Sequence, residues 1–172
     1  DLAGDFSAAD IGVAILSGDL TGSIAATGEA EESSGDIGRL HVVGGQMRNP
    51  GDVVVSAAGD LNFLMVSGGP ISGDVMAEGH IGRLLALDGV ENGVEASEGQ
   101  VYAGGGMDLL YSRGQVDGNV RVEGGDLALV EVLQPVGQTG IVPLGLGQFV
   151  GKVDHARAAQ RGGHLLAQHL ET

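Results

Sequence analysis

The chain has 172 residues, enough for one domain with a core, and its net charge of −15 disfavours nucleic acid and anionic membranes as partners. It contains no cysteine, which excludes disulfides and thiolate metal sites, and no apolar run long enough to span a bilayer. Aromatic residues make up only 3%, and the 33 glycines favour many short strands joined by tight turns.

An internal repeat is the strongest signal in the sequence. Residues 36–45 read DIGRLHVVGG, and residues 80–89 read HIGRLLALDG. If the first residue is counted as position 0, apolar residues recur at positions 1, 4 and 6, and glycine commonly follows at position 8. The same spacing occurs in six copies, which begin at residues 10, 36, 60, 80, 106 and 126. The repeat unit is therefore about 20 residues with insertions, a length typical of repeat architectures.

In chain order, each of the first five copies predicts a second short strand that alternates apolar residues and ends near a glycine. These strands are expected at 24–26, 55–57, 75–77, 94–96 and 120–122. The residues at 29–35, 46–50 and 100–105 leave the apolar spacing intact, so we expect them to be insertions in loops. The three-residue step between positions 1 and 4 predicts a bend, so each unit would contain three short strand pieces separated by corners.

A unit of this kind cannot bury its apolar row alone, so consecutive units must stack and cover one another. The sequence therefore predicts an all-β fold, a parallel β-helix (β-solenoid) of about six coils over residues 1–145. An antiparallel β-sandwich is the alternative, but it does not require equal spacing in every unit. Residues 146–172 lack the repeat. From about Val153 they favour helix, so we expect a partly helical tail that caps the stack or links it to a neighbour.

The segments GDIGRLHVVGG, GDVVVSAAG and ISGDVMAEG resemble the degenerate repeats of large bacterial secreted and cell-surface β-helix proteins, including adhesin and autotransporter passenger regions. The resemblance implies an extracellular or cell-surface location and a structural or adhesive role, within a larger assembly. Expected partners are further copies, neighbouring domains or polysaccharide. A carbohydrate-active β-helix that binds or cleaves an extracellular polysaccharide is the alternative function.

Position 0 of the repeat holds Asp10, Asp36 and Asp60 in the first three copies. Stacking would place these carboxylates in one column at the edge of the solenoid, where they repel one another unless N–H groups or a cation compensate. Calcium, which prefers oxygen ligands, is one interpretation of this column. The simpler interpretation is that each aspartate closes an Asx turn with its own backbone, and no other cofactor is expected.

Position 3 holds Arg39, Phe63 and Arg83 in consecutive copies, which predicts a ladder on the outer surface. Such a ladder can stabilise the outer face by cation–π contacts. It could also bind an acidic polysaccharide or the carboxylates of a partner through guanidinium groups.

No catalytic constellation is found in the sequence. Some β-helix folds are polysaccharide lyases or hydrolases, but this chain has no arginine and carboxylate group at a recognisable spacing. We therefore expect that the protein is not an enzyme.

Overall fold

The computed structural model describes residues 1–48, 52–88, 101–113, 120–125, 127–133, 149–150 and 156–159. These residues form strands and connecting turns, and no helix occurs among them. The strands are β1 (Phe6–Ala8), β2 (Ile11–Ser17), β3 (Ile24–Ala26), β4 (Ile37–Val43), β5 (Val53–Ala57), β6 (Leu61–Ser67), β7 (Asp74–Ala77), β8 (His80–Ala86), β9 (Val101–Ala103), β10 (Gly106–Ser112), β11 (Val120–Val122), β12 (Leu127–Leu133), β13 (Phe149–Val150) and β14 (Ala156–Ala159).

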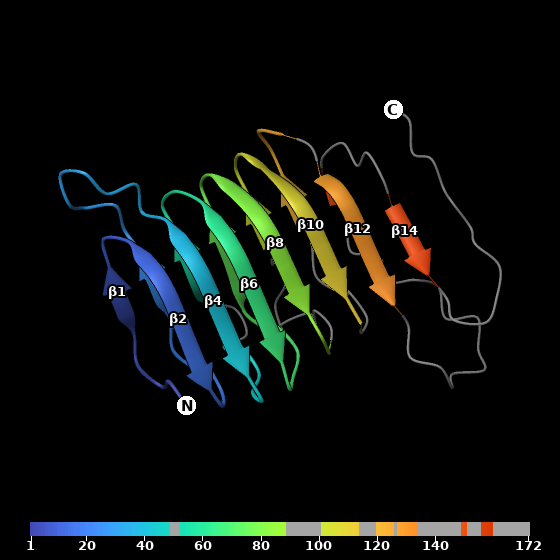
Figure 1. Cartoon of the computed structure of the whole chain (residues 1–172), viewed down its shortest axis with the longest axis horizontal. Coiled ribbons are helices and arrows are strands. Elements are labelled where there is room, and N and C mark those ends of the chain that lie inside the picture. Colours follow the sequence, from blue (N-terminus) through green and yellow to red (C-terminus); the bar gives the residue numbers. More distant parts are fainter. Residues whose placement is uncertain are drawn as a thin grey trace.

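The strands form two sheets in which all neighbours are parallel. The even-numbered strands make one seven-stranded sheet, the long sheet, and the odd-numbered strands make the other, the short sheet. Within each sheet the strands follow one another in chain order, so the backbone winds from one sheet to the other and back (Figure 1). This arrangement confirms the parallel β-solenoid and excludes the antiparallel sandwich.

The core consists of side chains stacked in files along the solenoid axis. Leu40 pairs in register with Leu64, which in turn pairs with Leu84, and all three are fully buried. This is the file that position 4 of the repeat predicts. Positions 1 and 6 form two further buried files of the long sheet, and the short sheet contributes the facing files that begin at Ile24 and Ala26.

A further core file lies at a corner between the two sheets and was not predicted. Leu20, Met47 and Ile71 are each fully buried and are joined by isolated parallel bridges from one coil to the next. Each coil contributes a single residue to this file, so the sequence offers no alternation by which to recognise it.

The structure corrects the predicted corner between positions 1 and 4. Each repeat copy has one continuous seven-residue strand in the long sheet, such as β4 or β6. Within β4, Ile37 and Leu40 are buried, whereas Gly38 and Arg39 between them are not. Gly38 and Arg39 are consecutive residues outside the core, yet β4 pairs with β2 and β6 without a register shift, so the alternation changes within one unbroken strand.

The second strand of the fourth copy is also corrected. β9, at Val101–Ala103, pairs with β7 on one side and with β11 on the other. Residues 101–103 are thus part of the short sheet and not an insertion, while the strand expected at 94–96 lies outside the described residues. Both segments place valine and alanine two residues apart, as Val-Glu-Ala and Val-Tyr-Ala, so the pattern alone does not distinguish them.

In the predicted tail, 146–172, only β13 and β14 are described. They pair in parallel with β11 and β12 and so continue both sheets. β14 is a strand at a place where helix was expected, so that expectation is wrong at 156–159. The rest of the segment expected to be helical from about Val153 lies outside the described residues.

Glycine at position 8 ends the first three long strands at a tight turn. Gly18, Gly44 and Gly68 have φ angles of 95°, 68° and 127°, a region that residues with a Cβ rarely adopt. Because each coil turns at the same position, the next coil begins in register with the one before it.

Candidate functional site

The aspartates at position 0 form the predicted column, and each binds the backbone of the following coil. The Asp36 N–H donates to Asp10 Oδ1 at 3.0 Å, and the Asp60 N–H donates to Asp36 Oδ1 at 2.7 Å. The His80 N–H donates to Asp60 Oδ1, also at 2.7 Å. A carboxylate at this position thus stabilises the junction between two coils, through hydrogen bonds to a charged acceptor. The Asx-turn interpretation, which confines the bond to one coil, did not include this contact.

The glycine that precedes position 0 leaves room for the carboxylate of the coil before. A Cβ at Gly59 would lie 2.2 Å from Asp36 Oδ1, and a Cβ at Gly79 would lie 2.2 Å from Asp60 Oδ1. These distances are far below a normal contact. The Gly59-Asp60 dipeptide thus has two roles, since its glycine accommodates the Asp36 carboxylate and its aspartate supplies the carboxylate that the His80 N–H binds.

Hydrogen bonding stabilises the charged form of Asp36. Its pKa is lowered first by the hydroxyl of Ser34, which donates to Oδ2, and then by the Asp60 N–H. The carboxylate therefore stabilises the fold above its unfolded pKa, and this contribution is lost as the pH falls through the lower folded value.

The described side chains at this column do not form a cluster that could bind a metal ion. Among the described residues, no group of three or more histidine and acidic side chains is placed to hold an ion. Asp10, Asp36 and Asp60 each already use one carboxylate oxygen on a neighbouring amide. Calcium at this edge therefore stays a prediction from the sequence.

A second aspartate column lies at the corner that follows the long strands, and the sequence interpretation missed it. The Asp19 N–H donates to Asp1 Oδ1 at 2.9 Å, and the Gln46 N–H donates to Asp19 Oδ1 at 3.0 Å. The Gly18-Asp19 dipeptide could have indicated this second column in the sequence, because it repeats the Gly-Asp pair whose aspartate is position 0. Carboxylates at two corners thus bind successive coils in the same direction.

At His80 the column contains a histidine in place of an aspartate, but its side chain still contacts the following coil. His80 occupies position 0 of the fourth copy, and its Nε2 lies 3.0 Å from Asp108 Oδ1 in the following coil. The His80 side chain is 37% exposed and the Asp108 side chain 67% exposed, so this contact is open to water.

The outer ladder is formed in part as predicted. Arg39 lies over the ring of Phe63, with its Cζ 5.0 Å from the ring centroid, a cation–π geometry. Arg83 pairs in register with Phe63 from the other side, which places all three residues in one file on the outer face of the long sheet. Arg39 and Arg83 are exposed, and Phe63 is half-buried. Among the described contacts, only the Arg39 guanidinium is placed over the ring.

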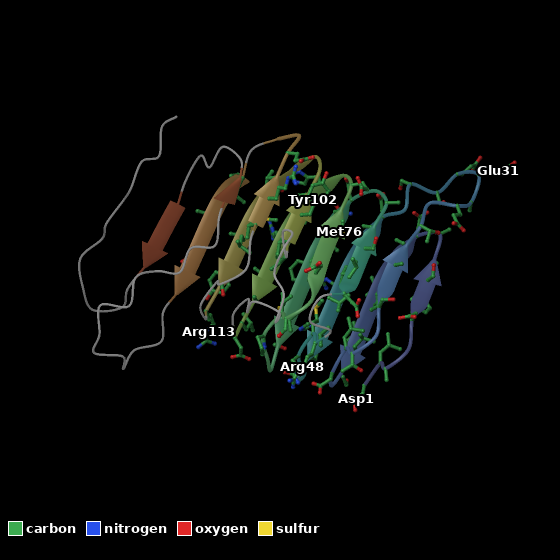
Figure 2. The ribbon with its side chains drawn as sticks, turned by 180° about the vertical axis from the view of Figure 1, so that it is seen from behind. Asp1, Glu31, Arg48, Met76, Tyr102 and Arg113 are labelled. Atoms are coloured by element: carbon green, nitrogen blue, oxygen red, sulfur yellow. The ribbon has the colours of Figure 1, made fainter. Side chains whose placement is uncertain are left out.

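A polar cluster on the outer face of the short sheet was not foreseen. The Tyr102 hydroxyl donates to Glu123 Oε2 at 3.0 Å, and Arg121 forms an ion pair with the other oxygen of Glu123. Tyr102 follows Met76 in the outward file of this sheet (Figure 2). The hydrogen bond to Glu123 is the main cause that raises the pKa of Tyr102, so the phenol stays protonated at neutral pH.

Comparison with models of known families, with curated proteins and with solved structures found no significant match to this chain. Within the described residues, the structure contains no helix that is both long and apolar enough to cross a membrane. A function must therefore be inferred from the fold and from the geometry of its surface columns.

Proposed function

We propose that this chain is a structural or adhesive β-solenoid module of a secreted or surface-exposed bacterial protein, and that it forms part of a larger assembly. The observation that carries the proposal is the use of the surface carboxylates. Asp10, Asp36 and Asp60 bind the next coil through hydrogen bonds to its backbone. Side chains that in an enzyme would be candidates for acid–base chemistry here hold one coil on another.

A rigid rod follows from this construction. Each coil is joined to the next by two parallel ladders, by the core files and by the carboxylates at the corners. Because every coil contacts mainly its neighbours, bending the rod would require breaking several of these contacts at once. Rods of this kind suit a spacer or an adhesive shaft. The likeness of the Gly-Asp repeats to secreted and cell-surface β-helix proteins supports the proposed location.

A spacer experiment tests the mechanical part of the proposal. The chain is inserted between two fluorescent domains, and the distribution of transfer efficiencies is compared with that of a Gly/Ser linker of equal length. The solenoid should give one narrow distribution that urea broadens, whereas the linker gives a broad one. A distribution as broad as that of the linker in native buffer would refute the rigid module. Antibody labelling of intact and of lysed source cells tests the location, and labelling confined to lysed cells would refute it.

Polysaccharide binding is a second candidate, favoured by the exposed guanidinium groups of Arg39 and Arg83 beside Phe63. Guanidinium groups bind carboxylates in a bidentate manner, and an aromatic ring can stack on a sugar. Binding to an acidic polysaccharide is measured by calorimetry for the wild type and for Arg39→Gln/Arg83→Gln. Arg113→Gln, at an exposed arginine outside this file, is the control. Equal binding by all three proteins would refute this site, and release of unsaturated sugars would show lyase activity.

A further inference from the structure

The outer face of the long sheet is apolar along position 5 of the repeat (Figure 1). Each coil contributes one side chain to this file, which runs in register through His41, Met65, Leu85 and Tyr111. All four residues are half-buried. His41 Nε2 is shielded from water and has no hydrogen-bond partner among the described residues, so the histidine extends the apolar surface. The strands β4, β6, β8 and β10 each have a neighbour on both sides, so this surface does not depend on either end of the solenoid.

The adjacent file at position 3 adds positive charge to this face. It contains Arg39, Phe63, Arg83 and Leu109, and neither arginine forms an ion pair with a described residue. In the strands β2, β4, β6, β8 and β10 the single acidic residue is Asp108, which contacts His80. The whole chain, in contrast, has 23 acidic side chains against 8 lysines and arginines. The face is thus cationic on an acidic molecule and is complementary to carboxylates.

The long strands have the composition of strands that are covered on both faces. Residues 40–43 read LHVV, residues 64–66 read LMV and residues 84–86 read LLA. A strand with one face in water alternates apolar and polar residues, whereas near-continuous apolar runs are typical of parallel sheets with helices on both faces. The core covers only the inner face of these strands. Their outer face therefore has the character of an interface.

The shape of this surface suits a single helix laid along the solenoid axis. Positions 3 and 5 lie about 7 Å apart along a strand, so the two files form a stripe about as wide as one helix. Between β4 and β10 the stripe runs for about 14 Å, the length of about ten helical residues. Arg39 and Arg83 are two coils apart, about 9.6 Å, and residues i and i+7 on one face of a helix are about 10.5 Å apart. An extended strand repeats its side chains every ~6.8 Å on one face, which matches this spacing less well.

We propose that the outer face of the long sheet binds an acidic amphipathic helix of a partner protein. Two carboxylates of the helix pair with Arg39 and Arg83, and its apolar side chains pack on Met65 and Leu85. The guanidinium pairs set the register of the helix, and the apolar contact supplies most of the buried area. The inference rests on the proposed adhesive role and adds the chemistry of the partner and the surface that binds it.

Other occupants complement this face less well. The same face of a second copy would offer no carboxylate between β2 and β8 to pair with the arginines. Residues 146–172 of this chain hold 2 acidic and 3 basic residues, so they supply no excess of carboxylates. An anionic membrane is repelled by the net charge of −15, and a polysaccharide has no aliphatic side chains to cover Met65 and Leu85.

Labelled helical peptides test the chemistry of the partner. One peptide of about 16 residues carries glutamates at i and i+7 with leucines between them on the same face, and a second has the same composition with the glutamates on the opposite face. In fluorescence anisotropy the wild type should bind the first peptide at least about tenfold more tightly than the second, and added salt should weaken the binding. Equal binding of the two peptides, or no binding of either, would overturn the proposal.

Surface variants locate the site on the solenoid. Arg39→Gln/Arg83→Gln and, separately, Leu85→Ser should each weaken binding of the first peptide by at least about tenfold. Arg48→Gln, at an exposed arginine of the corner that contains Met47, is the control and should bind within about twofold of the wild type. Melts followed by circular dichroism check that each variant is folded. Unchanged binding by the double arginine variant would place the peptide elsewhere and overturn this site.

Three further results would assign the face to another occupant and so contradict the helix. These are a concentration-dependent dimer that Leu85→Ser abolishes in light scattering, flotation of the protein with phosphatidylserine vesicles, and binding to polygalacturonate that requires Arg39 and Arg83 but not Leu85. The spacer experiment measures the rigidity of a single copy and would be unaffected by any of them. A wrong partner and a wrong structural role are therefore distinguishable.

Discussion

The coupling between Gly79 and Asp60 provides a sharp test of how the coils are joined. A Cβ at Gly79 would lie 2.2 Å from Asp60 Oδ1 and would displace the carboxylate from the His80 N–H, to which it is bound at 2.7 Å. A hydrogen bond to a charged group contributes about 1.5–3 kcal/mol, and the half-buried position of Asp60 favours the lower figure. Asp60→Ala should therefore cost about 1.5 kcal/mol, and Gly79→Ala should cost at least as much, because its Cβ would also lie 2.9 Å from the Gly59 carbonyl oxygen. In a domain of this size, that loss lowers the melting temperature by about 3–6 °C.

The decisive measurement is the double variant. Once Asp60→Ala has removed the carboxylate, the methyl group at position 79 still meets the Gly59 carbonyl oxygen at 2.9 Å, so only the part of its cost that comes from the carboxylate should disappear. The double variant should lose about 0.5–1.5 kcal/mol less than the sum of the two single losses, when unfolding in urea is followed by circular dichroism. Gly12→Ala, where a Cβ would meet nothing within 4 Å, is the control for a strand glycine. Fully additive losses would show that Gly79 does not serve to accommodate the carboxylate.

Three further predictions concern the surface. Burial, and then the nearby charge of Asp52, raise the pKa of Asp74, so its carboxylate opposes folding once the pH rises above the unfolded pKa. Asp74→Asn should increase the free energy of unfolding at neutral pH by less than about 1 kcal/mol and should give no gain in acid, which thermal melts across pH will check. Phe63→Leu should cost at most about 1 kcal/mol, and Arg39→Ala should cost nothing further in that background, whereas equal losses in both backgrounds would contradict the cation–π contact. EDTA should leave the melting temperature unchanged, because the aspartates at position 0 already bind amides, while a rise with added calcium would support a metal site instead.

The stacked core could be predicted from the sequence because the period of the apolar residues is the period of the solenoid. Leu40, Leu64 and Leu84 share position 4, and any fold that repeats with this period must bring them together. The path of the backbone between the buried positions could not be predicted in the same way. A continuous strand whose alternation changes at two consecutive residues outside the core, as in β4, produces the same spacing of apolar residues as a corner does.

The surface columns could likewise be predicted from the sequence only in part. The sequence predicts that Asp36 and Asp60 lie in one column, but the atom that each carboxylate binds depends on how closely consecutive coils approach. An Asx turn is a local bond and can be inferred from one segment, whereas a bond from Asp36 to the amide of the next coil exists only after stacking. The single-residue core file of Leu20 and Met47 was missed for a related reason, since one residue per coil has no local pattern.

The carboxylates that connect successive coils also bear on how such a chain can change its length. The acceptor at Asp10 receives an amide from the following unit, and Asp36 and Asp60 do so in turn, so the first three units offer the same complementary pair of faces. A tandem duplication of one such unit would therefore add a coil that can pair with the coils on both sides of it. Each added coil would extend the molecule by about 4.8 Å. The reach of the protein can thus be adjusted in uniform steps by recombination within its own coding sequence.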